Sequence, residues 1–244
     1  DLSQIHGELQ GRLRIACMTA FGRHVLAPLL PAFAALHPKL ELELLFTDRN
    51  VDVLKEDVDV SVRYRDALEP GMSVRPLASI PRILLASPEY LAQHGTPQTA
   101  EDLLAHSCLI YRRDRDGRFM RWPFSRDGKP VEPQLRIGAV GTDIDTLVEY
   151  ARAGGGIVWA GSFIPRQHAD PGLANTREEE VGVARRHVHP GLLVPIQLKP
   201  ARKGQLQFDN MPLDFFACFR DRQYVPAKVR ALVDYLVEVL PNQP

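Results

Sequence analysis

Two turns in the sequence have the composition of a site that could bind an anion. The first, residues 18–22 (MTAFG), carries Thr19, and the second carries Thr142, three residues ahead of Asp145. Each turn follows a short apolar stretch and precedes a helical pattern, so backbone N–H groups that no helix carbonyl accepts would face a ligand. A threonine at a helix start can also cap the helix, and capping is the alternative for both residues.

Arg63 and Tyr64 end an apolar stretch, residues 58–64, that is predicted to be a strand. A guanidinium presents a rigid fork of donors that matches a carboxylate, so Arg63 is a candidate to bind an acidic ligand. A structural ion pair with Asp59 or Asp66 is the alternative, because both acids lie close to it in the sequence.

Trp159 and Phe163 lie at the end of the apolar stretch that follows three glycines, residues 154–156. Aromatic rings in that place could pack on an apolar or aromatic ligand, and ordinary core packing is the alternative. The glycines lack the Lys and Ser/Thr of a phosphate-binding loop and follow a helical pattern, which predicts a helix stop.

The sequence carries no pattern typical of catalysis. We find no nucleophile elbow, phosphate loop or zinc signature, and therefore expect neither an enzyme nor a cofactor. His187 and His189 would share one face of a strand, but no Asp, Glu or Cys lies beside them to complete a metal site. Cys17 and Cys108 lie in apolar stretches and are predicted to be small buried residues.

Short apolar stretches alternate with amphipathic ones, which predicts an α/β fold with parallel strands. Strands are predicted at residues 13–18, 40–46, 58–64, 79–87, 134–140, 157–160 and 213–219. Helices are predicted at residues 21–36, 88–94, 142–152 and 226–240, and the dipeptide Asp127-Gly128 predicts a hairpin.

The composition is that of a globular protein without a strong net charge. Of the 244 residues, 45% are hydrophobic, and 30 Lys and Arg balance 30 Asp and Glu, which disfavours DNA or membrane binding by the chain itself. Three cysteines are an odd number and favour a reducing compartment, hence the cytoplasm. Residues 1–11 are polar, unlike a signal peptide, and the absence of an initiator Met suggests a fragment whose N-terminal part lies upstream.

A series of short motifs carries a family resemblance through their order and spacing. They are residues 11–15 (GRLRI), 28–33 (PLLPAF), 59–63 (DVSVR), 86–91 (ASPEYL), 101–103 (EDL), 106–109 (HSCL), 153–157 (AGGGI) and 225–236 (VPAKVRALVDYL). Together they cover nearly the whole chain, which resembles the C-terminal effector-binding domain of LysR-type transcriptional regulators. The Gly11 and Lys228 segments favour this interpretation over the alternative, a periplasmic solute-binding protein of the same fold.

The resemblance implies a type 2 periplasmic-binding-protein-like fold with two α/β lobes joined by two crossover strands. Lobe one would be residues 11–80 plus 212–244, lobe two residues 81–211, and residues 1–10 the end of a linker. A small effector, an organic acid, would bind between the lobes. The implied effector-binding residues are Thr19, Ala20, Phe21, Arg63, Tyr64, Thr142, Trp159 and Phe163. Residues 171–191 and 195–211 are longer than is usual for the family.

The resemblance also implies partners. The helix at about residues 21–36 would pack against the helix at residues 142–152 of a second chain, giving a homodimer or homotetramer. DNA would be bound only through an N-terminal winged helix-turn-helix that these residues do not contain, and no membrane contact is expected. A lyase or dehydratase on this fold would need an acid–base pair, and the sequence suggests none.

Overall fold

The computed structural model describes residues 8–49, 51–53, 55–65, 71–114, 116–164, 192–220 and 225–240. The chain forms two compact units. Unit 1 comprises Asp1–Ile80 and Leu213–Pro244, and unit 2 comprises Pro81–Pro212, so the chain passes twice from one unit to the other. His187 and His189, and the longer segment 171–191, lie outside the described residues.

Unit 1 is built on a five-stranded sheet in the order β2-β1-β3-β13-β4. The strands are β1 (Gln10–Cys17), β2 (Lys39–Phe46), β3 (Val60–Tyr64), β4 (Met72–Ile80) and β13 (Leu213–Arg220). The first three pair in parallel, as the sequence predicts, and β13 runs antiparallel to both β3 and β4. The parallel strands therefore come from residues 10–64. The strand β13, which forms after the chain returns from unit 2, lies between β3 and β4.

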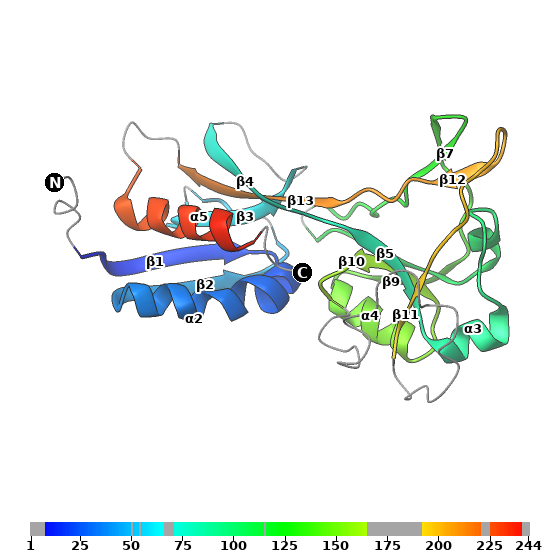
Figure 1. The fold of residues 1–244 in the computed structure, drawn as a ribbon, viewed down its shortest axis with the longest axis horizontal. Coiled ribbons are helices and arrows are strands. Elements are labelled where there is room, and N and C mark those ends of the chain that lie inside the picture. The colour runs from blue at the N-terminus through cyan, green and yellow to red at the C-terminus, as the bar shows by residue number, and fades with distance from the viewer. Residues whose placement is uncertain are drawn as a thin grey trace. The chain divides into compact units, whose positions relative to one another are not determined.

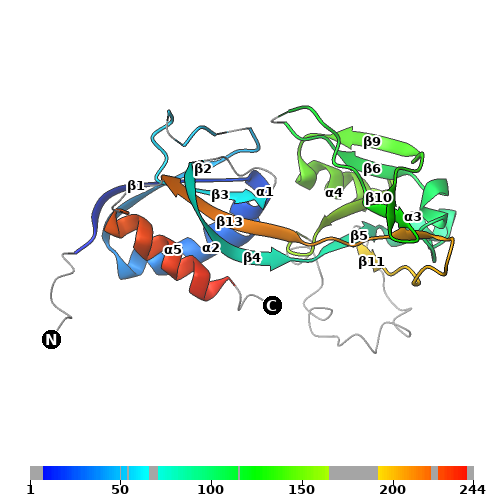
Figure 2. The same ribbon diagram turned by 90° about the horizontal axis from the view of Figure 1, so that it is seen from above.

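One continuous helix follows β1 and consists of α1 (Thr19–Phe21), a π-helical segment η1 (Gly22–Leu26) and α2 (Ala27–Leu36). The π-helical segment lies just ahead of Pro28 and Pro31, which cannot donate an N–H to the helical ladder. The closing helix α5 (Ala227–Val239) lies beside α2 on one face of the sheet (Figures 1 and 2). The Tyr235 hydroxyl of α5 donates to the Leu29 carbonyl at 2.8 Å.

The helix Thr19–Leu36 is long and apolar enough, by length and composition alone, to cross a membrane. A core helix of a globular domain meets the same criterion. In this structure Leu26, Leu30 and Phe33 are buried, and the Phe33 ring lies 5.3 Å from that of Tyr235 between centroids. The apolar face of this helix is therefore part of the core of unit 1.

Unit 2 contains a second five-stranded sheet in the order β11-β5-β10-β6-β9. The elements are β5 (Arg82–Ala86), α3 (Pro88–His94), η3 (Asp102–Ala105), β6 (Cys108–Tyr111), β9 (Ile137–Gly141), α4 (Ile144–Arg152), β10 (Ile157–Gly161) and β11 (Val194–Ile196). The strands β9, β6 and β10 are parallel, whereas β5 and β11 run antiparallel to their neighbours. Both units thus have mixed sheets rather than fully parallel ones.

Successive side chains of a strand point to opposite faces of its sheet. On one face of this sheet the strand side chains pack in a buried cluster with Tyr90, Leu103 and Trp122. The strands contribute Leu84, Ala86, Cys108, Ile110, Ile157 and Trp159. The helix α4 packs on β5, β6, β9 and β10, with Leu147, Val148 and Ala151 buried. Unit 2 therefore has a core of its own.

A small sheet in the order β12-β7-β8 completes unit 2. It consists of β7 (Phe124–Arg126), β8 (Lys129–Val131) and β12 (Leu206–Phe208). The predicted hairpin at Asp127-Gly128 is confirmed, and both residues have positive φ, 50° and 74°, as a tight hairpin turn requires. The strands β11 and β12 were not predicted, because each is only three residues long and lies in a polar stretch.

The structure differs from the sequence prediction at residues 79–87. Instead of one strand, β4 ends at Ile80 and β5 begins at Arg82, with Pro81 between them. Proline cannot donate to a sheet ladder, which explains the break at this position. The break coincides with the boundary between the two units.

Buried polar groups cluster where α3 meets β6. The Tyr90 hydroxyl accepts the Ser107 N–H at 2.9 Å and lies 3.1 Å from His106 Nδ1. Burial lowers the pKa of His106 below its ordinary value, the nearby His94 lowers it further, and Asp102 partly opposes the shift. The folded protein therefore favours the neutral form of this imidazole.

We predict that the stability of the protein falls as the pH drops below about 6.5, the ordinary pKa of histidine. Above that value His106 is neutral whether the chain is folded or not. Below it the unfolded chain takes up the proton first, which favours unfolding. The drop in melting temperature between pH 7.5 and 5.5 should shrink in His106→Gln and persist in His37→Gln, a half-buried histidine of unit 1. An unchanged drop in His106→Gln would contradict this assignment.

Candidate functional site

The candidate site of unit 1 lies at the edge of the sheet where its parallel strands end. The strands β1 and β2 pair over their full length, from Gln10 opposite Lys39 to Cys17 opposite Phe46. The Thr47 N–H donates to the Cys17 carbonyl at 2.8 Å, which extends this pairing by one residue. The turns that follow both strands are therefore neighbours at the carboxyl edge, the usual place for a ligand in an α/β sheet.

A carboxylate occupies the start of the helix in unit 1. The Thr19 N–H donates to Asp48 Oδ1 at 2.9 Å, and Met18, the residue at the cap position, makes no side-chain cap bond. Capping by the Thr19 side chain, the alternative for this residue, is therefore not observed, and an acid from the turn after β2 accepts the N–H at the helix start. Ala20 and Phe21 follow in the first helical turn. Asp48 was missed, although its place two residues after a predicted strand was a usable signal.

The aromatic residues at this edge pack among themselves. The Phe21 ring is 1% exposed and stacks on Phe215, with 3.8 Å between centroids. The Tyr64 ring lies 5.2 Å from Phe215, between centroids, and is half-buried. These three rings therefore form a wall whose position is fixed from within unit 1.

Arg63 is buried, with 8% of its surface exposed. Its Nε donates to Ser61 Oγ at 2.7 Å and its guanidinium also donates to the Val51 carbonyl. The predicted alternative, a pair with Asp59, is wrong, because Asp59 accepts instead from Lys228 Nζ at 3.2 Å and from the Arg14 N–H at 2.9 Å. Arg63 thus ties the segment at Val51 to the sheet, and Asp66 lies outside the described residues.

In unit 2 the start of α4 is also held by an acid. The Asp143 carboxylate accepts the N–H groups of Asp145 and Thr146 at 3.3 and 3.0 Å, as well as the Thr146 hydroxyl at 2.6 Å. Capping by Thr142, the alternative for this residue, is therefore not observed, and the cap is the next residue, Asp143. Thr142 itself is exposed and lies between the end of β9 and this cap.

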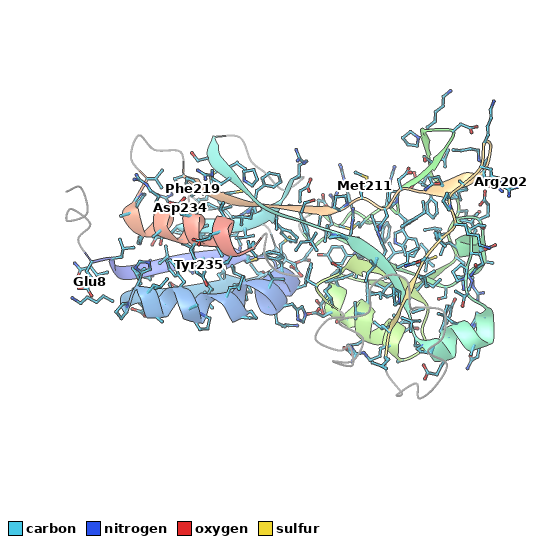
Figure 3. All side chains as sticks on the ribbon, viewed as in Figure 1. Glu8, Arg202, Met211, Phe219, Asp234 and Tyr235 are labelled. Carbon is cyan, nitrogen blue, oxygen red and sulfur yellow. The ribbon has the colours of Figure 1, made fainter. Side chains whose placement is uncertain are left out.

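Trp159 and Phe163 are buried in unit 2, which supports the core alternative for both. The Trp159 Nε1 donates to Asn210 Oδ1 at 3.0 Å, and the Arg82 guanidinium lies 3.5 Å from the centre of its ring. Arg82 Nε also donates to the carbonyl of Met211, which Figure 3 labels, at 2.8 Å. A Cβ added at Gly161 would lie 2.4 Å from the ring of Phe163.

The predicted residues thus divide between the two units. Unit 1 brings together Thr19, Ala20, Phe21, Arg63 and Tyr64 at one edge of its sheet. In unit 2 the parallel strands β9 and β10, on either side of β6, lead to Thr142 and Phe163 at a common edge.

A cavity of about 150 Å³ lies at the opposite edge of the unit 1 sheet. It is lined by residues before β3, at the end of β13 and at the start of α5, which are Asp57, Val58, Asp59, Phe219, Arg220, Pro226 and Val229. Its acids have internal partners, since Asp57 pairs with Arg12 at 2.5 Å and Asp59 with Lys228.

The described residues contain no group of three or more His, Cys, Asp or Glu that could hold a metal ion. All three cysteines are free and buried. Burial raises the pKa of the Cys17 thiol far above its usual range and that of Cys108 to about 12. A thiol that is protonated at neutral pH is a poor nucleophile.

Comparison with known proteins identifies relatives of one kind. A family model described as LysR substrate binding domain matches residues 6–189. The chain is 44% identical over 122 residues to the HTH-type transcriptional regulator DmlR of Escherichia coli, covering 50% of this chain and 39% of that protein. It is 30% identical to a probable HTH-type transcriptional regulator, LtrA of Klebsiella pneumoniae, over 95% of this chain and 67% of that protein.

Solved structures show the same fold. The regulatory domain of CrgA, a LysR-type transcriptional regulator from Neisseria meningitidis, matches with a TM-score of 0.71 and 24% identity. The match covers 95% of this chain and all of that domain. The chain thus has the fold of that domain, and its match to DmlR spans less than half of the length of that relative.

We predict that Asp143→Ala lowers the free energy of unfolding by about 1 kcal/mol, the usual cost of losing a helix cap. Thr142→Ala should change it by less than about 0.5 kcal/mol, as expected for an exposed residue without a cap bond. Urea denaturation of the two variants and the parent protein measures both values. The reverse order of effects would show that Thr142 is the cap after all.

Proposed function

The chain belongs to the family of LysR substrate-binding domains, and on that premise we propose that it is the ligand-sensing part of a LysR-type DNA-binding transcriptional regulator. The observation that carries the proposal is the family match over residues 6–189, together with relatives that are named as HTH-type regulators. The alternative of a periplasmic solute-binding protein receives no support from the comparisons. The family is one of regulators rather than enzymes, and we infer that this chain is not an enzyme.

In this proposal unit 1 and unit 2 are the two lobes of the effector-binding domain, and residues 1–10 are the end of a linker. Specific recognition of DNA is the task of a winged helix-turn-helix outside these residues. The protein works in the cytoplasm, where its DNA is found and where three free cysteines remain reduced. The effector is a small molecule held by the loops at the carboxyl edges of the two sheets.

We infer that Thr19 and Thr142 contact the effector directly, because they follow the ends of parallel strands and neither is buried. The remaining predicted residues shape the site: Ala20, Phe21, Arg63, Tyr64, Trp159 and Phe163. Burial of Phe21, Arg63, Trp159 and Phe163 favours this supporting role over direct contact. No cofactor or metal is part of the proposal.

The effector we propose is a small organic acid, and the two acids at the helix starts restrict which acids fit. A second negative charge about 5 Å from Asp48 is repelled by about 3 kcal/mol at an effective dielectric constant of about 20. A helix start stabilises an anion by only about 0.3 to 1 kcal/mol. The acid must therefore carry donor groups that face Asp48 or Asp143, or reach a cation as well.

The experiment is a thermal-shift screen with matched sets of small organic acids, their amides and the corresponding amines. A bound effector stabilises the folded protein, and at one hundred times its Kd the gain is about 2.7 kcal/mol. We expect an acid, and neither its amide nor its amine, to raise the melting temperature. A response to amines alone would contradict an acidic effector, and an unresponsive protein across a broad library would contradict the sensing role.

We also propose that the chain forms a homodimer, or a homotetramer through the parent protein. Each unit exposes apolar residues on one helix and on the edge strand beside it. Unit 1 exposes Leu36 of α2 and Leu44 of β2, and unit 2 exposes Ile137 and Val140 of β9 and Tyr150 of α4. In an isologous dimer the exposed set of unit 1 would pack against the exposed set of unit 2 of the partner chain, and this contact would occur twice.

We predict that Tyr150→Glu shifts the chain toward the monomer in analytical ultracentrifugation, because the charge would be buried in that interface. Phe119→Glu is the matched control, since Phe119 is 53% exposed against 48% for Tyr150 but lies on neither of the two surfaces. The control should sediment like the parent. Equal behaviour of the two variants, or a parent chain that stays monomeric at high concentration, would refute this interface.

A further inference from the structure

The net charge of zero conceals a local excess of positive charge at one end of the small sheet of unit 2. The turn between β7 and β8 and the turn ahead of β12 lie at the same end, since Arg126 pairs with both Lys129 and Leu206. Both turns carry two cations, so that four are gathered there: Arg126, Lys129, Arg202 and Lys203. We call these four residues the cationic tip.

Hydrogen bonds hold the two turns of the cationic tip together. The Gly204 N–H donates to Asp127 Oδ1 at 2.8 Å, which links one turn to the other. Within the second turn, which Figure 3 marks by Arg202, the Arg202 N–H donates to Gln205 Oε1 at 2.8 Å. The positive φ of Asp127, Gly128 and Gly204 shows that both turns are tight. The four cations therefore extend from a fixed frame.

The four cations of the cationic tip outnumber the acids beside them. All four side chains are exposed, and none forms an ion pair with a residue that the structure describes. Asp127 accepts the Gly204 N–H and keeps its negative charge, and Glu101 accepts the N–H of Leu206 beside Arg126, so these two acids leave a net charge of about +2 at this end of the sheet. Other cations of this unit do have acidic partners, as Arg113 has Asp116 and the exposed Arg121 has Glu132.

We propose that the cationic tip binds the phosphate backbone of duplex DNA without reading its sequence. Three strands about 4.8 Å apart span roughly 10 Å, and that length of duplex presents about six phosphate charges. The tip offers no aromatic or large apolar side chain, whereas the centre of a protein–protein interface is rich in both and poor in lysine. Its chemistry thus matches a polyanion better than the surface of an acidic protein.

This inference rests on the proposed function, which places DNA beside the domain, and it modifies one expectation drawn from the sequence. The balanced charge count disfavoured any DNA contact by the chain itself. That count could not show that residues 126–129 and 202–203, far apart in the sequence, lie together. A contact with phosphates alone carries no sequence information, so specific recognition still requires another domain.

The test measures how salt affects binding of the 244-residue chain to a random 20-base-pair duplex by fluorescence anisotropy, from 20 to 150 mM NaCl. Two tip variants, Arg126→Gln/Lys129→Gln and Arg202→Gln/Lys203→Gln, each remove two charges. The control Arg75→Gln/Arg230→Gln removes two exposed charges of unit 1. Circular dichroism and melting temperature establish that all variants fold.

We expect each tip variant to reduce the slope of log K against log salt by about 1.8, or about 0.9 for each phosphate that the variant no longer neutralises. The control should keep the parent slope. No binding at 20 mM NaCl, an unchanged slope in the tip variants, or an equal reduction in the control would overturn the proposal. So would tighter binding of polyglutamate than of DNA. The thermal response to an effector is measured separately, so failure of the tip leaves the sensing role standing.

Discussion

Parallel strands run in the same direction, so their carboxyl ends lie along one edge of the sheet, and this constraint places the polar groups of the candidate site. In unit 1 the register of β1 and β2 brings Cys17 opposite Phe46, so the next residues along both strands meet. The bond from the Thr19 N–H to Asp48 is the direct consequence. In unit 2 the same constraint brings the ends of β9 and β10 to the edge that carries Thr142 and Phe163.

Both helices that begin at these edges have a carboxylate at their start, and these two charges affect which ligands the candidate site can bind. Asp48 comes from a neighbouring turn, whereas Asp143 caps its own helix. Each stabilises its helix and at the same time weakens the anion-binding character of the helix start, because the repulsion between two nearby carboxylates exceeds the contribution of a helix dipole. A sensing site of this kind would favour acids with donor groups over simple anions.

The sequence predicted the features that depend on local patterns. Alternating Leu and Glu in residues 40–46 indicated β2, the spacing of apolar residues indicated a helix at residues 21–36, where the structure has Thr19–Leu36, and Asp127-Gly128 indicated a hairpin. It could not predict contacts between distant segments, such as Asp48 with Thr19 or Asp127 with Gly204, because each depends on how elements are placed in space. The caps were misassigned for a related reason, since a threonine and a nearby acid compete for the same N–H groups.

The most direct test of the central claim, that the carboxyl edges of the sheets bind an effector, is a crystal structure of the chain with an acid that raises its melting temperature. We expect the bound acid to contact the helix start at Thr19 in unit 1 and the turn at Thr142 in unit 2. Density for the acid at the opposite edge instead, in the cavity lined by Asp57, Arg220 and Val229, would contradict it.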